Sequence, residues 1–359
     1  MDKLNKIQLK GFKSISKIDL ELRQLNILIG PNGAGKSNFI DVFRFMNKLV
    51  QKDLQFFLAM KGGADRFLHF GRQITNAIEI RLLFKSNHYA CTLVPDQTGK
   101  LLFKEEYCQW LTEQREESGP QTLASRGDQE SGLPDKSAAV ARHIASYLSD
   151  WPIYHFHDTS DTAKVKQSGP IHDNERLRPQ AENLAAFLFS IQDTEQYQRI
   201  VQTIQRVAPF FQNFILKPEK PDPNRIRLRW KHRGTDEYFD ANTFSDGTLR
   251  FICLTTLLLQ PYLPTMILLD EPELGLHPYA MQLLAGMMRS VANKTQIIAS
   301  SQSVTLANQF EWFDLIIVEQ FDNASQFKRL EEEQIKLWLE DYRIGDLWEK
   351  NVIGGTPPC

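Results

Sequence analysis

The sequence predicts an α/β fold in which a mixed, β-rich lobe is joined to a parallel sheet flanked by helices, with a helical insertion between them. Three observations predict it. The N-terminal part alternates as strands do, a glycine-rich loop follows a short apolar run near residue 30, and the last third alternates apolar runs with helical stretches. Strands separated by helices in this way favour a parallel sheet.

The N-terminal lobe is expected over residues 1–110. Two strands are indicated by apolar residues that alternate with polar ones, namely Leu4, Ile7, Leu9, Ile18, Leu20 and Leu22. Residues 25–29 form a short buried strand that ends in a glycine, and a helical stretch is expected from there to about residue 60. Further strands are predicted in the segments IEIRLLFK and YACTLV.

The middle of the chain is predicted to be an insertion over residues 111–176. Within it, residues 116–137 are polar and rich in Gly, Ser and Pro, which is typical of a flexible linker. Residues 177–216 are expected to form a helical subdomain of two helices, because apolar residues recur there at three- and four-residue spacing.

The C-terminal lobe is predicted over residues 217–359. Its strands are expected in MILLD, TQIIAS and DLIIVE, with a helix from Pro278 between the first two and another helix before the third. The carboxyl ends of such parallel strands are where α/β sheets bind their ligands. We therefore look for chemistry in the residues that follow these strands.

Composition limits the function classes. The 359 residues include 42% apolar and 24% charged residues, as in ordinary globular proteins, and 42 Lys and Arg against 44 Asp and Glu leave a net charge of −2. No overall basic field therefore indicates nucleic acid or an anionic membrane. The four cysteines have no C-x-x-C spacing, and no apolar segment is long enough for a signal peptide or a membrane span. We expect a cytoplasmic protein without membrane contact.

The glycine-rich loop reads GPNGAGKS and matches G-x-x-x-x-G-K-[ST] between an expected strand and an expected helix. Its glycines let successive N–H groups point at phosphates, Lys36 adds a charge at the β and γ oxygens, and Ser37 offers a hydroxyl to Mg²⁺. We call residues 30–37 the phosphate loop. Nucleotide contacts are predicted at Gly30, Pro31, Asn32, Gly33, Ala34, Gly35, Lys36, Ser37 and Asn38.

A second part of the site is predicted where the apolar run MILL ends in two acids, Asp270 and Glu271. Asp270 is expected to hold Mg²⁺ or its water, and Glu271 to polarise the attacking water as a general base. Upstream, FSDGTLR precedes an apolar helix, so Ser245, Gly247 and the helix N-terminus can present a hydroxyl, an N–H and a positive dipole end to an anion. The alternative for Ser245 is a simple helix cap.

These motifs together, with the phrase DEPELGLHP, resemble the RecF/SMC/OLD-like branch of the ABC-class ATPases, and most closely its stand-alone ATPases. The resemblance implies a P-loop NTPase fold of the ABC/SMC-head type. It also implies a homodimer that sandwiches two ATP molecules, with Lys36 and Ser37 acting within one chain and Ser245 and Gly247 acting across the dimer. Asp246 and Thr248 depart from the usual signature motif, where a second Gly and a Gln or Glu stand.

The resemblance implies two further site residues. Lys13, in the motif GFKSI, falls where related heads place a basic residue near the nucleotide. Gln302 stands where ABC heads generally have a switch histidine. A glutamine amide can donate to a γ-phosphate or orient water, but it cannot carry a charge. The resemblance therefore implies slow ATP turnover.

Residues 225–233 alternate basic and mostly apolar residues. If the segment is one strand, its basic side chains lie on a single face and could follow a DNA backbone; they are Arg225, Arg227, Arg229, Lys231 and Arg233. The alternative is a solvated edge whose charges oppose strand pairing. His155 and His157 share a face in an extended segment, but no second pair with metal-site spacing accompanies them, so we interpret them as structural or adjacent to the ligand.

The function predicted from these features is a dimeric, ATP-hydrolysing switch that controls a partner effector or DNA. OLD-type relatives carry a TOPRIM nuclease module in which paired aspartates hold metal, and because no such pair follows the strand that ends at Glu319, the resemblance implies no intrinsic nuclease here. The resemblance implies a separate effector protein, for example a TOPRIM-like nuclease, in phage defence. The alternatives are a DNA repair or chromosome-maintenance head stimulated by DNA, a transport ATPase subunit, and a scaffold that binds ATP without turnover.

Overall fold

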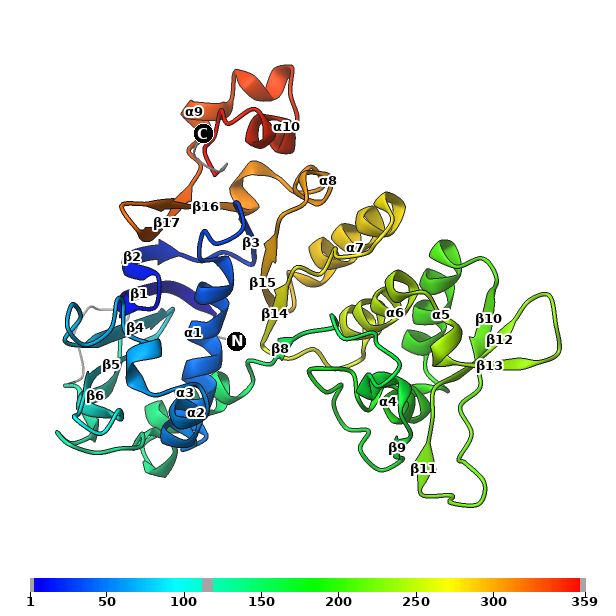
Figure 1. The fold of residues 1–359 in the computed structure, drawn as a ribbon, viewed down its shortest axis with the longest axis horizontal. Coiled ribbons are helices and arrows are strands. Elements are labelled where there is room, and N and C mark those ends of the chain that lie inside the picture. The colour runs from blue at the N-terminus through cyan, green and yellow to red at the C-terminus, as the bar shows by residue number, and fades with distance from the viewer. Residues whose placement is uncertain (1–2, 112–118, 356–359) are drawn as a thin grey trace.

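The computed structural model describes residues 3–111 and 119–355, and the described residues form two six-stranded sheets with helices between and beside them (Figure 1). The first sheet is antiparallel throughout, in the order β2-β1-β4-β5-β6-β7. Its strands are β1 (Leu4–Phe12), β2 (Ile15–Glu21), β4 (Ile78–Phe84), β5 (Asn87–Pro95), β6 (Leu101–Trp110) and β7 (Gln121–Ala124). This sheet is the β-rich lobe expected from the N-terminal alternation.

The second sheet lies in the middle of the molecule, in the order β17-β16-β3-β15-β14-β8, and all of its pairs are parallel except β16 with β17. Its strands are β3 (Leu25–Ile29), β8 (Ile153–Tyr154), β14 (Met266–Asp270), β15 (Gln296–Ser301), β16 (Leu315–Phe321) and β17 (Ala324–Arg329). The parallel sheet predicted from the last third of the chain is confirmed, and the N-terminal strand β3 lies at its centre.

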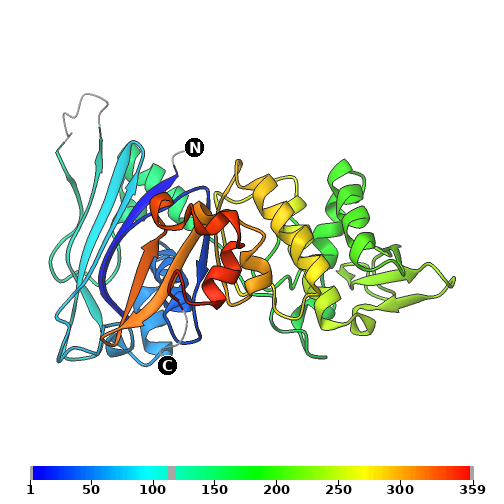
Figure 2. The ribbon, with the colours of Figure 1, turned by 90° about the horizontal axis from the view of Figure 1, so that it is seen from above.

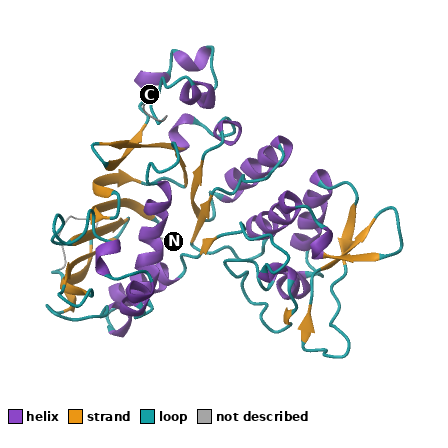
Figure 3. Ribbon diagram, viewed as in Figure 1, coloured by secondary structure: helices purple, strands orange, loops and turns teal. Residues whose placement is uncertain are grey.

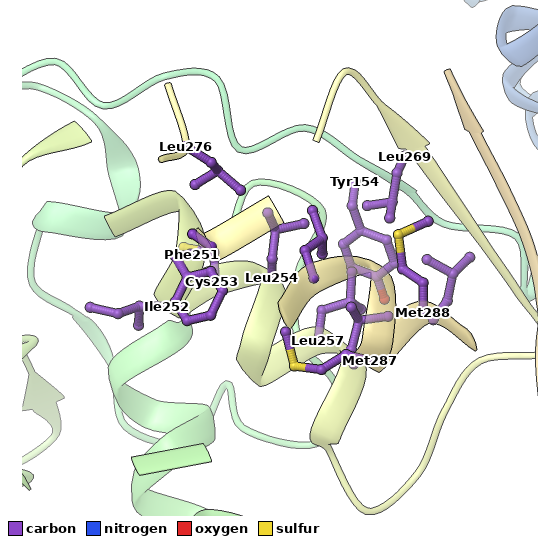
Figure 4. Close-up of a cluster of buried hydrophobic side chains, with 14 of the residues drawn as sticks. Tyr154, Phe251, Ile252, Cys253, Leu254, Leu257, Leu269, Leu276, Met287 and Met288 are labelled. Atoms are coloured by element: carbon purple, nitrogen blue, oxygen red, sulfur yellow. The ribbon is translucent and has the colours of Figure 1, made fainter. Parts of the chain in front are cut away.

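Alternation along the central strands buries side chains on both faces of this sheet. One set, including Leu28, Leu268 and Ile298, packs against the inner face of the first sheet, together with α1 (Lys36–Val50), α2 (Leu54–Met60) and α3 (Ala139–Ser149). The other set faces a second core with α6 (Asp246–Leu259) and α7 (Pro278–Val291). Figure 4 shows part of this second core, where Leu254 and Leu257 of α6 gather with Leu269 of β14 and Met288 of α7.

The remaining elements form a lobe beside the central sheet and a small C-terminal unit (Figures 2 and 3). The lobe contains α4 (Leu184–Ile191) and α5 (Glu195–Val207), the sheet of β10 (Phe211–Phe214), β12 (Arg229–His232) and β13 (Tyr238–Asp240), and the pair β9 (Gly169–Pro170) and β11 (Arg225–Ile226). The C-terminal unit contains α8 (Val304–Ala307), α9 (Glu332–Ile335) and α10 (Ile344–Glu349). The two helices predicted within residues 177–216 are present as α4 and α5.

The segment predicted as a flexible linker differs from that prediction. Residues 116–118 lie outside the described residues, but β7 pairs with β6, and both Leu123 and Leu133 are buried. The buried carboxylate of Glu106 accepts hydrogen bonds from Ser131 Oγ and from the Gly132 N–H at 2.9 Å. These long-range contacts give order to a polar segment whose local composition suggested none.

Candidate nucleotide-binding site

The phosphate loop connects β3 to α1 and is folded around the side chain of Lys36. This side chain is buried, and its Nζ donates to the carbonyl oxygens of Gly30 at 2.7 Å and Pro31 at 2.9 Å. Gly35 has φ of +110°, and a Cβ there would lie 2.0 Å from Ser325 Oγ. The loop therefore requires glycine at this position both for its backbone conformation and for its packing.

Asp270, the last residue of β14, and Glu271 after it lie near the start of α1. The Ser37 hydroxyl lies 3.4 Å from Asp270 Oδ1, which also accepts a hydrogen bond from Ser300 Oγ. The structure thus brings together the hydroxyl and the carboxylate that the sequence predicts as Mg²⁺ ligands. Burial lowers the pKa of Lys36, and the nearby carboxylates of Glu271, Asp270 and Glu273 oppose that shift. The site therefore concentrates negative charge around a single buried ammonium group.

Glu271 follows Asp270 in an uncommon backbone conformation. Its φ is +46°, a value rare for residues other than glycine. Its N–H lies 3.1 Å from both the carbonyl oxygen and the Oγ of Ser300. Strained backbone of this kind occurs mostly at functional sites, where the surrounding structure holds it in place. The side chain of Gln302 donates from Nε2 to Glu271 Oε1, so the predicted base and the residue at the switch position are in contact.

The segment after the edge strand β8 lies between the site and the lobe. His157 Nε2 is 2.7 Å from the Asp270 carbonyl oxygen, and His155 contacts Arg44 of α1. Burial and the neighbouring Arg44 lower the pKa of His155. In the part of the chain that is described, no cluster of three His, Cys, Asp or Glu residues could hold a metal ion. The two histidines are adjacent to the nucleotide site, in agreement with the sequence-based interpretation.

Lys13 lies in the turn between β1 and β2 and contacts Asp41 of α1, which also pairs with Arg44 at 2.6 Å. The neighbouring Ser14 Oγ accepts a hydrogen bond from Asn38 Nδ2 at 2.7 Å. This turn is therefore attached to the first turns of the helix that carries Lys36. Direct contact between Lys13 and nucleotide stays a prediction.

Ser245 and Gly247 begin helix α6. Ser245 is the N-cap, and its Oγ accepts a hydrogen bond from the Thr248 N–H at 3.3 Å. A Cβ on Gly247 would lie 2.3 Å from the Gly275 carbonyl oxygen, so the helix start packs tightly against the loop that follows β14. Among the described residues, no hydrogen bond or ion pair links Ser245 or Gly247 to the phosphate loop. Their role across a dimer stays a prediction.

The basic stripe at residues 225–233 differs from the predicted single strand. Ile226, Leu228 and Trp230 are buried as expected, but the chain divides into β11 and β12, which belong to different sheets. Acidic partners also neutralise part of the stripe, through the ion pairs Arg227–Glu219 at 3.4 Å, Arg229–Asp240 at 3.2 Å and Lys231–Asp236 at 3.0 Å. Arg225 donates to Ser168. The stripe is therefore not one continuous strand, and DNA contact through it stays a prediction.

The structure adds residues that sequence reasoning missed. Ser300 and Ser301, at the end of β15, bond to Asp270 and Glu273 respectively. Glu273, the last acid of the DEPE sequence, was a visible signal, but its partners lie about thirty residues away and a local pattern does not reveal them. No helix among the described residues is long and apolar enough to cross a membrane.

Comparison with known proteins gives a family match and a curated relative. A family model described as "AAA domain, putative AbiEii toxin, Type IV TA system" matches residues 25–308. The chromosome partition protein Smc of Methanocaldococcus jannaschii is 34% identical over 105 residues, which make up 27% of this chain and only 8% of that protein. The chain thus spans a small part of this relative's length.

Solved structures show the same fold. An Smc head bound to the C-terminal winged-helix domain of ScpA matches with a TM-score of 0.61 and 15% identity, over 93% of this chain and 99% of that one. A Pyrococcus furiosus Smc head with an extended coiled coil, bound to the C-terminal domain of ScpA, matches with a TM-score of 0.56 and 14% identity. This match covers 95% of this chain and 99% of that one. These matches confirm the predicted fold class, and because the family model covers most of the chain, the protein belongs to the AAA-domain family that it describes.

Proposed function

We propose that this chain binds ATP with Mg²⁺ and hydrolyses it slowly, and that the nucleotide controls its association with a second copy and with an effector. The observation that carries the proposal is the meeting of Lys36, Ser37, Asp270 and Glu271 at the carboxyl ends of β3 and β14, the two parallel strands on either side of β15. Such an edge is the usual ligand site of an α/β sheet.

The oxygen donors at this edge fit a magnesium ion. Ser37 Oγ and Asp270 Oδ1 lie 3.4 Å apart, and hydroxyl and carboxylate oxygens are the donors that Mg²⁺ prefers. These two residues would hold the ion, which neutralises phosphate charge when bound. Lys36 would leave its two carbonyl partners to contact the β and γ phosphates. Glu271 would accept a proton from the attacking water, and Gln302 would orient that carboxylate.

The switch itself requires ATP to bind one association state more tightly than the other. Sandwiching the γ-phosphate between the phosphate loop of one chain and Ser245 and Gly247 of a second chain would supply that difference. Both residues lie at the start of a fourteen-residue helix, a place where N–H groups suit an anion. The family description, which names a putative toxin and a toxin–antitoxin system, supports control of a separate effector in a defence system, for which we propose phage as the target.

A second candidate is a chromosome-maintenance head, which the likeness to Smc supports. The two functions differ in their response to DNA. A maintenance head is expected to hydrolyse ATP several times faster when DNA is added, whereas a defence switch is expected to respond to its effector instead.

The test is the solution mass of the Glu271→Gln protein with and without Mg-ATP. Because this variant should bind ATP without hydrolysing it, we expect ATP to convert a monomer to a dimer, measured by light scattering on a sizing column. A matched control adds Lys36→Ala to the same variant, which should stay monomeric. If nucleotide binds and neither mass nor shape changes, the sandwich mechanism is wrong and Ser245 is only a helix cap.

A further inference from the structure

The buried acid Glu273 bonds to the loop that carries Gln302. Only 6% of Glu273 is exposed, and its Oε1 accepts hydrogen bonds from Ser301 Oγ at 2.6 Å and from the Gln302 N–H at 2.9 Å. Its Oε2 is fully buried and has no hydrogen-bond partner among the described residues. The Oε1 atom of Glu273 therefore holds two hydrogen-bond donors of a single loop, and its Oε2 atom is left without a hydrogen bond.

This arrangement is costly for the fold. Burying a carboxyl group with an unpaired oxygen costs free energy, and apolar residues of similar volume often serve stability better at such positions. Burial raises the pKa of Glu273, while the two donors act in the opposite direction. The presence of an acid at this position is therefore explained by the groups that it holds in place and not by a gain in stability.

What Glu273 holds is the residue in contact with Glu271. The backbone N–H of Gln302 bonds to Glu273, and the side-chain amide of Gln302 donates to Glu271 Oε1. Ser301 extends the arrangement, because its Oγ accepts from the Ser303 N–H at 3.0 Å, and Ser303 caps α8. The two acids thus hold the two ends of one glutamine, Glu273 through the backbone and Glu271 through the side chain.

We propose that Glu273 is a positioning residue for ATP hydrolysis, which fixes the loop at Ser301 and Gln302 so that the Gln302 amide meets Glu271. The inference rests on the proposed ATPase function. Among the described residues, Glu273 makes no hydrogen bond to any residue of the phosphate loop. Its effect should therefore fall on turnover and leave nucleotide binding nearly unchanged.

Kinetics of three variants test the proposal. Glu273→Ala is expected to lower kcat by about 10-fold to 100-fold, as substitution of supporting residues around a site commonly does. KM should stay within about 3-fold, because the phosphate loop is untouched. Glu273→Gln keeps a carbonyl oxygen that can accept the same two bonds, so its kcat should stay within about 3-fold of the original value. Asp314→Ala is the matched control, since Asp314 is also a buried acid, 8% exposed, but lies before β16 at the other end of the sheet.

A double-mutant cycle with Gln302→Ala separates positioning from general damage. If Glu273 acts through Gln302, then Gln302→Ala alone and the double variant have the same kcat, because the second substitution removes nothing further. Losses that add in the double variant would overturn the proposal, as would equal kcat in Glu273→Ala and the original protein. If Glu273→Ala does not fold, Ser301→Ala combined with Gln302→Ala supplies an equivalent cycle, because Ser301 Oγ bonds to the same Glu273 oxygen.

Hydrogen exchange provides a readout that does not depend on turnover. The peptide covering residues 300–306 should exchange faster in Glu273→Ala than in the original protein, and Glu273→Gln should restore its protection. If the original protein shows no ATPase activity while this difference is present, the proposed function fails, and only the fixing of the loop at Ser301 and Gln302 by Glu273 stands. Unchanged exchange together with normal activity refutes the positioning role alone.

Discussion

Replacing Lys36 with alanine is expected to lower ATP turnover by about 100-fold or more and to weaken ATP binding strongly. The reason is that the buried ammonium group is the only positive side chain found bonded within the phosphate loop of the described structure, with Gly30 and Pro31 as its partners. Removing one preorganised donor from a charged transition state typically costs on the order of 100-fold to 1000-fold. Phosphate release and the affinity for a fluorescent ATP analogue measure the two effects.

The matched control is Lys48→Ala. Lys48 lies in the last turn of the same helix, where it pairs with Asp53 at 2.6 Å, so its removal should leave both measurements within about 2-fold. Equal activity in the Lys36→Ala and original proteins would show that ATP is bound elsewhere or that turnover belongs to a contaminant.

Replacing Phe43 with alanine is expected to lower the free energy of unfolding by about 3–5 kcal/mol. Phe43 is fully buried on α1, and its ring lies 5.5 Å from that of Phe39 and 5.3 Å from that of Trp151. The substitution leaves a cavity between the two sheets that the neighbouring aromatic rings cannot fill. Urea denaturation followed by tryptophan fluorescence measures the loss.

The control for this substitution is Phe56→Ala, because Phe56 on α2 is 66% exposed. It should change the unfolding free energy by less than about 0.5 kcal/mol. If Phe43→Ala also changes the unfolding free energy by less than about 0.5 kcal/mol, the packing of Phe43 against its neighbours contributes little to stability, which would contradict the structure.

Much of the nucleotide site could be predicted from sequence because its signals are local. The phosphate loop and the acids of β14 each lie within a few residues of a recognisable strand, and the structure places Ser37 beside Asp270. The fold class was predictable for the same reason, since strands and helices alternate regularly in the last third of the chain.

What could not be predicted depends on partners far away in the sequence. The strand β7 forms because β6 offers it an edge, although it lies in a segment that is mostly polar. The basic stripe looked continuous, but Glu219 and Asp240 pair with its arginines and the chain changes sheets between Ile226 and Arg229.

Glu273 was missed because only the pairing of β14 with β15 brings Ser301 and Gln302 to it.

The position of β3 has a consequence for how the chain is made. This apolar strand is synthesised early, yet both of its neighbours in the sheet, β15 and β16, come late, and Leu25 pairs with Ile297. Contacts of such high sequence separation slow folding, and unpaired apolar strands are prone to aggregate while they wait. On the ribosome the nucleotide site can therefore be completed only after β15 has been synthesised. A chain interrupted before β15 would release the phosphate loop attached to an open strand edge, which makes it a natural substrate for chaperones and proteases.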